Sequence, residues 1–339
     1  MRLHYAGPLP EPIGFLLLPR FSMMAFFSAV EPLRIANRIA GETLFTWRVI
    51  SLDSAPVTAS NDMTLLADDS LESAPALPSI AICASFEPEE RLTRRLLRWL
   101  HQRDQDGCVL GGIDTGSLIL ARADLLTGHR VTLHWESLPA FRERFPELDA
   151  VESLFEVGPR RFSCAGGAAA MDMMLDLIAR RHGEALAAAV SEQLIHARMR
   201  PRHDQQRQDL TQRLGTHKHS VIEAVALMER HLEAPLPLAR LAARIGISLR
   251  QLQRLFEQEL GERPRDHYLR LRLQRARQLL RETDRDILSI GLACGFTSAS
   301  SFSRAYKQHF GASPRHARRG PDTPPHGMTT DGKKTSPEV

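Results

Sequence analysis

Cysteine is scarce in this chain, and its scarcity excludes two architectures. The 339 residues include four cysteines, Cys83, Cys108, Cys164 and Cys294, which lie far apart and form no C-x-x-C pair. This spacing suggests neither a zinc site nor a disulfide framework. A reducing cytoplasm fits best, and we expect neither a bound metal nor another cofactor.

Long hydrophobic runs are also missing. The short run Ile13–Leu18 lacks the length and the basic flank of a signal peptide, and it ends in Pro19. No stretch is long and apolar enough to predict a transmembrane helix, so we expect no membrane partner. Hydrophobic residues nevertheless make up 43% of the chain, which is ordinary for a globular protein with room for two domains.

Positive charge is concentrated in one part of the chain. Residues 219–320 contain 18 Lys and Arg against 10 Asp and Glu, whereas residues 1–218 contain 24 against 27. A basic excess of this kind favours a polyanionic partner such as DNA. The final stretch, 321–339, is rich in Pro, Thr, Asp and Lys, and we expect it to be disordered.

The first half alternates predicted strands with predicted helices. Short apolar runs predict strands at Ile13–Leu18, Trp47–Leu52, Ile80–Ala84, Cys108–Gly111 and Val131–His134. Helices are predicted at Met23–Ile39, Leu92–Gln102 and Ala168–Ile178, and a hairpin at Phe155–Val157 with Arg161–Cys164. The alternation predicts an α/β fold in which helices cover both faces of a parallel sheet.

A sharp turn, Gly112–Gly116, connects the fourth of these strands to a helix. Glycines around one polar residue lift its side chain, that of Asp114, to the end of the sheet. Clefts at this position commonly bind ligands, and a carboxylate beside the aromatic face of Trp135 and near His134 suits a small cation. Alternatively, Asp114 caps the helix that follows, and the two roles are compatible.

The last third predicts helix-turn-helix units. The stretch Gly246–Phe256 has Gly246 in a turn, Ser248 as a helix cap, and arginine and glutamine on one helical face. Its opposite, apolar face consists of Leu249, Leu252, Leu255 and Phe256. Paired with the helix Leu238–Ile245, it predicts one unit. Ile287–Cys294 with Ser298–Phe310 predicts a second, and the helix Tyr268–Arg281 lies between the two in the sequence.

One run of residues extends through both predicted units. It consists of Ala242, Gly246, Ser248, Arg250, Leu252, Arg254, Phe256, Gly261, Pro264, Tyr268, Arg272, Leu273, Ala276, Leu279, Leu280, Ile287, Ile290, Gly295, Phe296, Ser298, Ser301, Phe302, Arg304, Gly311 and Pro314. This run resembles the DNA-binding domain of AraC-type transcription regulators. The resemblance implies promoter DNA as a partner, with the two units entering successive major grooves.

The same resemblance places particular residues at or beside the base-facing positions. They are Arg250, Gln251, Gln253 and Arg254 in the first unit, and Ser298, Ser300, Ser301, Ser303 and Arg304 in the second. Arginine can bond guanine and glutamine can bond adenine bidentately, whereas serine contacts are weaker and less exclusive. We therefore expect the first unit to carry most of the sequence specificity and the second to contribute more phosphate contact.

The first half has its own set of matching residues. They are Leu18-Pro19-x-Phe21-Ser22, Glu31-Pro32-Leu33-Arg34-x-Ala36-Asn37, Gly111–Gly116, His134-Trp135-Glu136 and Cys164–Gly167. This set resembles the amidotransferase-like, PfpI-type sensor domain of the GlxA-like branch of AraC-type regulators. The resemblance implies a flavodoxin-like α/β sandwich with a parallel sheet, and dimerisation through this domain.

In enzymes of that wider superfamily, the turn after the strand holds a cysteine nucleophile. Asp114 occupies the position here, and a carboxylate is a far poorer nucleophile than a thiolate toward a carbonyl. We therefore predict no catalytic residues. An amidotransferase-like or hydrolase-type enzyme with a DNA tether remains the alternative, as does a DNA-binding protein without an effector.

Over its whole length, the chain is similar to bacterial regulators of the catabolism of carnitine, glycine betaine, related methylamines such as dimethylglycine, and arginine. Their effectors combine a cationic nitrogen with a carboxylate. The resemblance therefore implies a small zwitterionic effector, for a site that we assign to Asp114, Thr115, His134, Trp135, Glu136 and Phe21.

Together, these observations predict a sequence-specific transcriptional regulator. We expect an activator of catabolic genes that acts as a homodimer together with RNA polymerase. Its predicted segments are an effector-sensing domain at 10–185, a helical connector at 186–218, a double helix-turn-helix domain at 219–320 and a disordered tail at 321–339.

Overall fold

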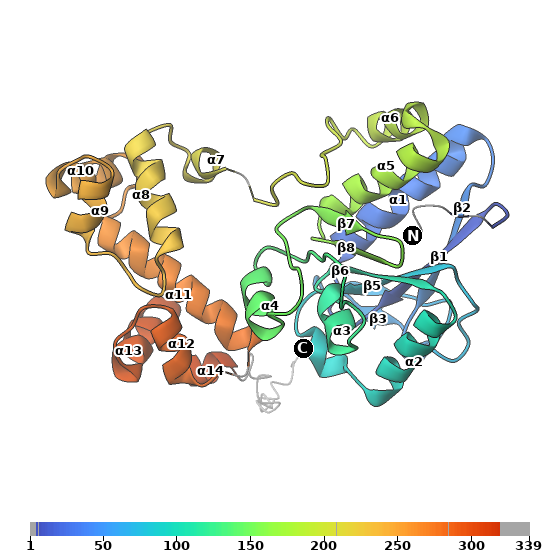
Figure 1. Ribbon diagram of the computed structural model, residues 1–339, viewed down its shortest axis with the longest axis horizontal. Coiled ribbons are helices and arrows are strands. Elements are labelled where there is room, and N and C mark those ends of the chain that lie inside the picture. The colour runs from blue at the N-terminus through green and yellow to red at the C-terminus, as the bar shows by residue number, and fades with distance from the viewer. Residues whose placement is uncertain (1–4, 6, 208, 284, 319–339) are drawn as a thin grey trace, which may run out of the picture. The chain divides into compact units, whose positions relative to one another are not determined.

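The computed structural model describes residues 5, 7–207, 209–283 and 285–318 (Figure 1). The chain divides into two compact units, Met1–Ile222 and Glu223–Val339. The tail at 321–339, predicted to be disordered, lies outside the described residues. No helix in the described ranges is long and apolar enough to cross a membrane.

The first unit is built on a six-stranded sheet with the strand order β2-β1-β5-β6-β8-β7. The parallel strands are β1 (Glu11–Leu17), β2 (Phe45–Ile50), β5 (Ser79–Ala84), β6 (Val109–Asp114) and β8 (Arg161–Cys164), and β7 (Phe155–Val157) is antiparallel at the edge. A separate pair consists of β3 (Val57–Thr58) and β4 (Thr64–Leu65). The five parallel strands have the flavodoxin-like order, so the predicted fold class is confirmed.

Helices cover both faces of this sheet (Figure 1). One face packs against α1 (Met23–Ala40), α5 (Ala169–His182) and α6 (Glu184–Gln193). The other packs against α2 (Arg94–Gln105), α3 (Gly116–Arg122) and α4 (Leu138–Arg144), and a short 3-10 helix, η1 (Pro88–Arg91), precedes α2. Each face has its own apolar core. All six residues of β5 are buried, as expected for a central strand between two helical layers.

The strand predicted at Val131–His134 is wrong. Val131 makes only an isolated bridge with Ala150. The backbone of the next residue, Thr132, bonds to two serine side chains. Thr132 N–H donates to Ser163 Oγ and Thr132 O accepts from Ser117 Oγ, both at 2.9 Å. These bonds take the place of ladder bonds, so the segment runs beside the sheet without extending it.

The helical pattern expected for the connector is also wrong over much of its length. Helix α6 ends at Gln193, and the next helix is α7 (Leu210–Leu214). Ile195 has a φ of 54°, in the left-handed region that β-branched residues rarely adopt, and Pro201 interrupts the chain further on. We call residues 194–207 the strap. It is irregular because its polar groups are bonded to other parts of the first unit.

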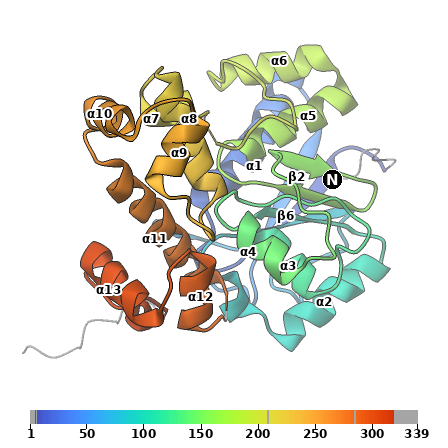
Figure 2. The same ribbon diagram turned by 60° about the vertical axis from the view of Figure 1, so that its left-hand side comes forward.

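The second unit is helical. Its region contains α8 (His219–Arg230), α9 (Leu238–Arg244), α10 (Leu249–Leu260), α11 (Pro264–Glu282), α12 (Ile287–Ala293), α13 (Ala299–Phe310) and α14 (Pro314–Arg318). Figures 1 and 2 show α9 and α10 at one end of α11, and α12 and α13 at the other. One side of α11 is apolar and buried at Leu273, Ala276, Leu279 and Leu280. Both predicted helix-turn-helix units are therefore present on one long helix.

Candidate functional site

The turn between α9 and α10 is fixed by backbone and cap bonds. Gly246 has a φ of 75°, which glycine adopts without a steric penalty, and Ile247 N–H donates to Ala242 O at 3.1 Å. Gln251 N–H donates to Ser248 Oγ at 3.2 Å, and Ser248 N–H donates to Gln251 Oε1 at 2.9 Å. This reciprocal capping box defines where α10 begins.

Helix α10 presents guanidinium and amide groups on its outer face. Arg250, Gln253 and Arg254 are exposed, and their spacing of three and four residues places them on one side of the helix. On the opposite side, Leu252 and Phe256 are fully buried. The packing of these two side chains therefore fixes which way the three polar side chains point.

Two residues of α10 differ from their expected roles. Leu249, predicted on the apolar inner face, is 37% exposed. As the first helical residue it projects toward the start of the helix, away from the buried face. Gln251 is exposed as expected, but its side-chain oxygen belongs to the cap. Glu257 and Glu259 make the second half of α10 acidic. Because these carboxylates repel DNA phosphates, we expect the first half of α10 to approach the DNA.

The second helix-turn-helix unit is held to α11 by an arginine. Arg272 Nε donates to Cys294 O and Arg272 Nη2 donates to Gly295 O, each at 2.7 Å. The guanidinium carbon also lies 4.3 Å from the centre of the Phe296 ring. Arg272 therefore satisfies the carbonyls of the turn between α12 and α13 and packs against its aromatic residue.

Helix α13 has hydroxyl groups where α10 has longer side chains. Ser298 Oγ caps the helix by accepting from Ser301 N–H at 3.2 Å, and it lies 3.1 Å from both Ser300 Oγ and Ser301 Oγ. Ser301 Oγ also donates to Ser298 O at 2.9 Å. Ser303 is half-buried, whereas Arg304 is exposed. The serines of this helix thus bond mainly to one another, and Arg304 is the exposed long side chain among the predicted contacts.

Asp114 lies at a sharp turn between β6 and α3, as predicted. Its φ is 62°, in the left-handed region, and its side chain is buried. A Cβ on Gly116 would lie 1.9 Å from Ile82 O, and one on Gly166 would lie 2.8 Å from Asp114 Cβ. Only glycine fits at these two positions. The N-cap position of α3 is taken by Thr115, whose Oγ1 donates to Ser85 O at 2.7 Å.

The thiols of the two cysteines that interact with the Asp114 charge have raised pKa values. Burial raises the pKa of the Cys164 thiol to about 12, with the Asp114 charge adding to the effect, and burial also raises the pKa of the Cys83 thiol. Neither group is a thiolate near neutral pH, and the thiolate is the nucleophile. Within the described residues, no cluster of three or more His, Cys, Asp or Glu side chains is placed to hold a metal ion.

The other residues assigned to the ligand site have different surroundings. Phe21 is fully buried in the core, with its ring edge-on to Phe26 at 6.0 Å. The rings of His134 and Trp135 lie 5.5 Å apart and are half-buried, and Glu136 is exposed. Burial lowers the pKa of His134, opposed by the nearby Glu136 charge, so the site favours the neutral imidazole.

The face of Trp135 already carries a cation from the chain itself. The guanidinium carbon of Arg207, in the strap, lies 4.4 Å from the centre of the indole ring. Arg207 was not among the predicted site residues, and neither was Asp172, a buried carboxylate to which the strap binds. Asp172 could have been singled out from the sequence, because it is a carboxylate inside the apolar run Ala168–Ile178. No feature of the local sequence singles out Arg207.

Two helix-turn-helix units on a shared helix define the class of protein as a DNA-binding transcriptional regulator. A helix-turn-helix domain family matches residues 241–320. The HTH-type transcriptional regulator CdhR of Pseudomonas aeruginosa is 48% identical over 310 residues, which is 91% of this chain and 92% of CdhR. GbdR of the same species, also named an HTH-type transcriptional regulator, is 43% identical over 92% of this chain and 85% of its own.

A solved structure agrees with these relatives. The crystal structure of an AraC family transcriptional regulator from Pseudomonas putida is 30% identical, with a TM-score of 0.50, and covers 55% of this chain and all of its own. The chain therefore belongs to the AraC family of helix-turn-helix transcriptional regulators, with a flavodoxin-like α/β domain at its N-terminus.

Proposed function

We propose that this regulator reads DNA unequally with its two helix-turn-helix units and responds to a small cationic or zwitterionic metabolite bound by its α/β domain. The observation that carries the DNA half is the outer face of α10, where Arg250, Gln253 and Arg254 are exposed together above a buried apolar face. Arginine and glutamine are the side chains that bond purine edges bidentately in the major groove.

In this proposal the second unit mainly positions the protein. Arg304 contacts phosphate, and Ser300, Ser301 and Ser303 contribute short, less selective contacts. The hydroxyl bonds among Ser298, Ser300 and Ser301 support this division of roles, because groups already bonded to each other gain less from a base edge.

The ligand half of the proposal rests on the end of the sheet. Asp114 is a buried carboxylate at the turn, and the His134–Trp135 pair lies on the segment that Ser117 joins to α3 through Thr132 O. A carboxylate and an indole face both attract a cationic nitrogen. Betaines, carnitine and dimethylglycine carry such a nitrogen. In this proposal the protein works in the cytoplasm as a homodimer. It contacts RNA polymerase and activates catabolic genes.

We also propose that the α/β domain is not an enzyme. Asp114 stands at the turn, and the buried thiols of Cys83 and Cys164 are protonated near neutral pH. Turnover of a small amide or aldehyde that Asp114→Asn abolishes would contradict this part of the proposal.

One experiment tests both halves with the full-length chain. An operator is selected from a pool of randomised duplexes, and its affinity is measured by fluorescence anisotropy with and without glycine betaine, carnitine, dimethylglycine and arginine. We expect at least one zwitterion to change operator affinity and to raise the melting temperature, because a ligand that binds the folded state stabilises it. Asp114→Asn should weaken that response, and Asp124→Asn, on the surface loop after α3, is the matched control.

The outcomes separate the two halves. Selection of no sequence at all would contradict the DNA half. Selection of a clear operator whose affinity and melting temperature respond to none of the zwitterions would contradict the ligand half and favour a DNA-binding protein without an effector.

A further inference from the structure

The strap, residues 194–207, has no regular secondary structure and yet is bonded to the first unit at several points. Its own bonds include Arg198 Nη2 to Asp204 Oδ2 at 2.7 Å, and its middle is attached where Leu154 N–H donates to Arg202 O at 2.8 Å. Arg202 also pairs with Glu156 at 3.3 Å. An irregular segment held by specific side-chain contacts can be released when those contacts are lost.

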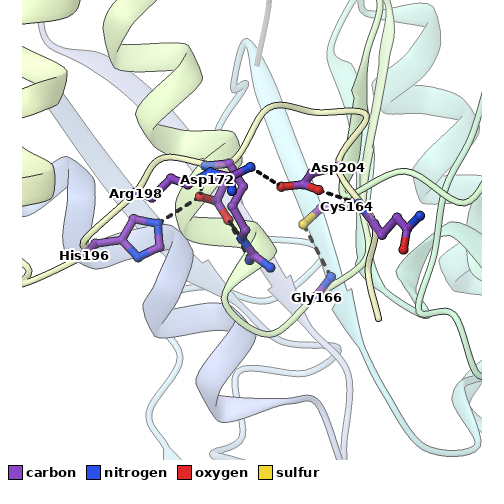
Figure 3. A network of polar contacts seen from close by, with 8 residues as sticks. Cys164, Gly166, Asp172, His196, Arg198 and Asp204 are labelled. Atoms are coloured by element: carbon purple, nitrogen blue, oxygen red, sulfur yellow. Dashed lines mark hydrogen bonds and ion pairs between the residues drawn. The ribbon is translucent and has the colours of Figure 1, made fainter. Parts of the chain in front are cut away.

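The first end of the strap is strongly anchored. Asp172, near the start of α5, is 1% exposed. One of its oxygens accepts from Arg200 Nε at 2.9 Å and Nη2 at 2.7 Å, and the other lies 2.9 Å from both Arg200 N and His196 Nε2. Figure 3 shows His196 reaching Asp172 beside the Arg198–Asp204 pair. Charge-assisted bonds to a buried carboxylate are among the strong ones, so this end stays in place.

The second end is anchored at Gln206 without a charged partner for that side chain. Gln206 Nε2 lies within bonding distance of three acceptors, Thr132 Oγ1 at 3.1 Å, Leu133 O at 3.0 Å and Ser153 O at 2.8 Å. An amide nitrogen has two hydrogens, so the three bonds cannot all be made at full strength. The buried Oε1 of Gln206 has no hydrogen-bond partner among the described residues, which further weakens this end.

The next residue, Arg207, lies over Trp135 at 4.4 Å. A guanidinium on an indole face is held by the same attraction that would hold an ammonium ligand there. Gln206 bonds Thr132, and the carbonyl of Thr132 in turn accepts from Ser117 Oγ of α3. Helix α3 begins directly after the turn that carries Asp114. The second end of the strap therefore lies on the segment that carries the proposed ligand site.

We propose that Arg207 is a built-in competitor for the cation subsite on Trp135, and that a bound cationic ligand displaces it and releases the strap from Arg202 onward. This inference rests on the proposed ligand-binding function. A ligand that takes the indole face binds only the released arrangement, so it shifts the population toward that arrangement. The Asp172 anchor holds the beginning of the strap throughout. Release then increases the conformational freedom of the segment between the strap and α8.

The test compares four full-length variants by hydrogen exchange and ligand affinity, with tetramethylammonium and glycine betaine as probes. Without a probe, Arg207→Ala should speed exchange at residues 202–207 and leave residues 196–200 protected. It should also bind the probes about two- to fivefold more tightly than the parent chain, because the competing contact is of the usual cation–π strength. Arg207→Lys, which keeps the cation, should fall between the two.

Two further variants act as controls. Arg95→Ala removes an exposed arginine of α2 that pairs with Glu72 and makes no part of the strap, and it should leave probe affinity unchanged. Trp135→Ala removes the subsite and should abolish the probe-induced rise in exchange at residues 202–207.

Two results would overturn the inference. One is a strap that exchanges at the parent rate in Arg207→Ala. The other is a probe that binds, as seen by a raised melting temperature, without changing strap exchange. In that second case the ligand-binding function stands while the displacement of Arg207 does not. If neither probe raises the melting temperature of any variant, the ligand half of the proposed function falls, and this inference falls with it.

Discussion

The two helix-turn-helix units have one backbone design and two surface chemistries. Both second helices begin with a serine cap, at Ser248 and Ser298, and both bury an aromatic side chain, Phe256 beside His267 of α11 and Phe302 beside Gly291 of α12. On the outside, α10 carries long arginine and glutamine side chains, whereas the start of α13 carries hydroxyls bonded to each other. Similar packing therefore does not imply similar reading of DNA.

The turns of the two units are also held differently. Both turns are closed by backbone and cap bonds, but only in the second does an arginine, Arg272 of α11, also donate to two turn carbonyls among the described residues. The largest expected effect on stability follows from this difference. Arg272→Ala leaves two carbonyls without their charged donor and exposes the Phe296 face, and it should lower the free energy of unfolding by about 2–4 kcal/mol.

The matched control for that change is Arg270→Ala. Arg270 is two residues away on α11 and pairs with the half-exposed Glu262 at 2.8 Å, so its loss should cost less than about 1 kcal/mol. Urea denaturation of both variants measures the difference. Equal losses in the two variants would contradict the role assigned to Arg272.

The caps offer a second, smaller comparison. Ser248→Ala and Ser298→Ala each remove the hydroxyl that accepts the N–H of the third residue of a second helix, and each should cost about 1 kcal/mol. Ser298→Ala also breaks the bonds to Ser300 and Ser301 and frees those hydroxyls. We therefore expect only Ser298→Ala to change base preference, measured as relative affinities for operator variants. A change of preference in Ser248→Ala alone would reverse the comparison.

The salt dependence of DNA binding separates positioning from reading. If Arg304 contacts phosphate, Arg304→Ala should weaken all sequences alike and lower the slope of log affinity against log salt by about 1. Lys218→Ala, at an exposed residue before α8, is a control that should leave the slope unchanged. A variant that loses preference for particular bases, with an unchanged slope, would show instead that Arg304 reads sequence.

The smallest expected effect is a pH dependence at the first unit. His267 is 3% exposed, its ring is edge-on to Phe256 at 5.6 Å, and burial lowers its pKa although the Glu262 bond opposes this. The folded state thus favours the neutral imidazole, and this contribution to stability is complete above the pKa of an unfolded histidine and is lost as the pH falls below it. The melting temperature of the parent protein should be lower at pH 5.5 than at pH 7.5. The decrease should be smaller for the His267→Gln variant. An equal drop in both proteins would exclude His267 as the cause.

The sequence predicted the parts of this protein that depend on local patterns. Apolar spacing in α10 predicted which face packs, and the glycines around Asp114 predicted the turn, because a Cβ at Gly116 has no room. Leu249 shows the limit of spacing alone. Its position in the apolar series is correct, but it is the first residue of the helix and is 37% exposed.

The strap could not be predicted in the same way. Its arginines and glutamines form no apolar period, and their partners are distant in the sequence: Arg200 bonds Asp172, 28 residues away, and Gln206 bonds Thr132, 74 residues away. Such pairings exist only once the sheet has formed and brought α5 and the segment after α3 together. From the sequence we assigned the face of Trp135 to a ligand and did not foresee Arg207 there. The contact between Arg207 and Trp135 also joins residues that are distant in the sequence.

The most direct test of unequal reading is a selection of operators by the full-length chain and by Arg254→Ala, with Gln258→Ala as a control on the same helix. We expect the parent and Gln258→Ala to select a site with two half-sites, of which one is sharply defined. Arg254→Ala should lose preference at that sharply defined half-site, with about 1–3 kcal/mol less discrimination at one base pair, and keep the other half-site unchanged. Selection of the same sequence with the same sharpness by Arg254→Ala would contradict the account.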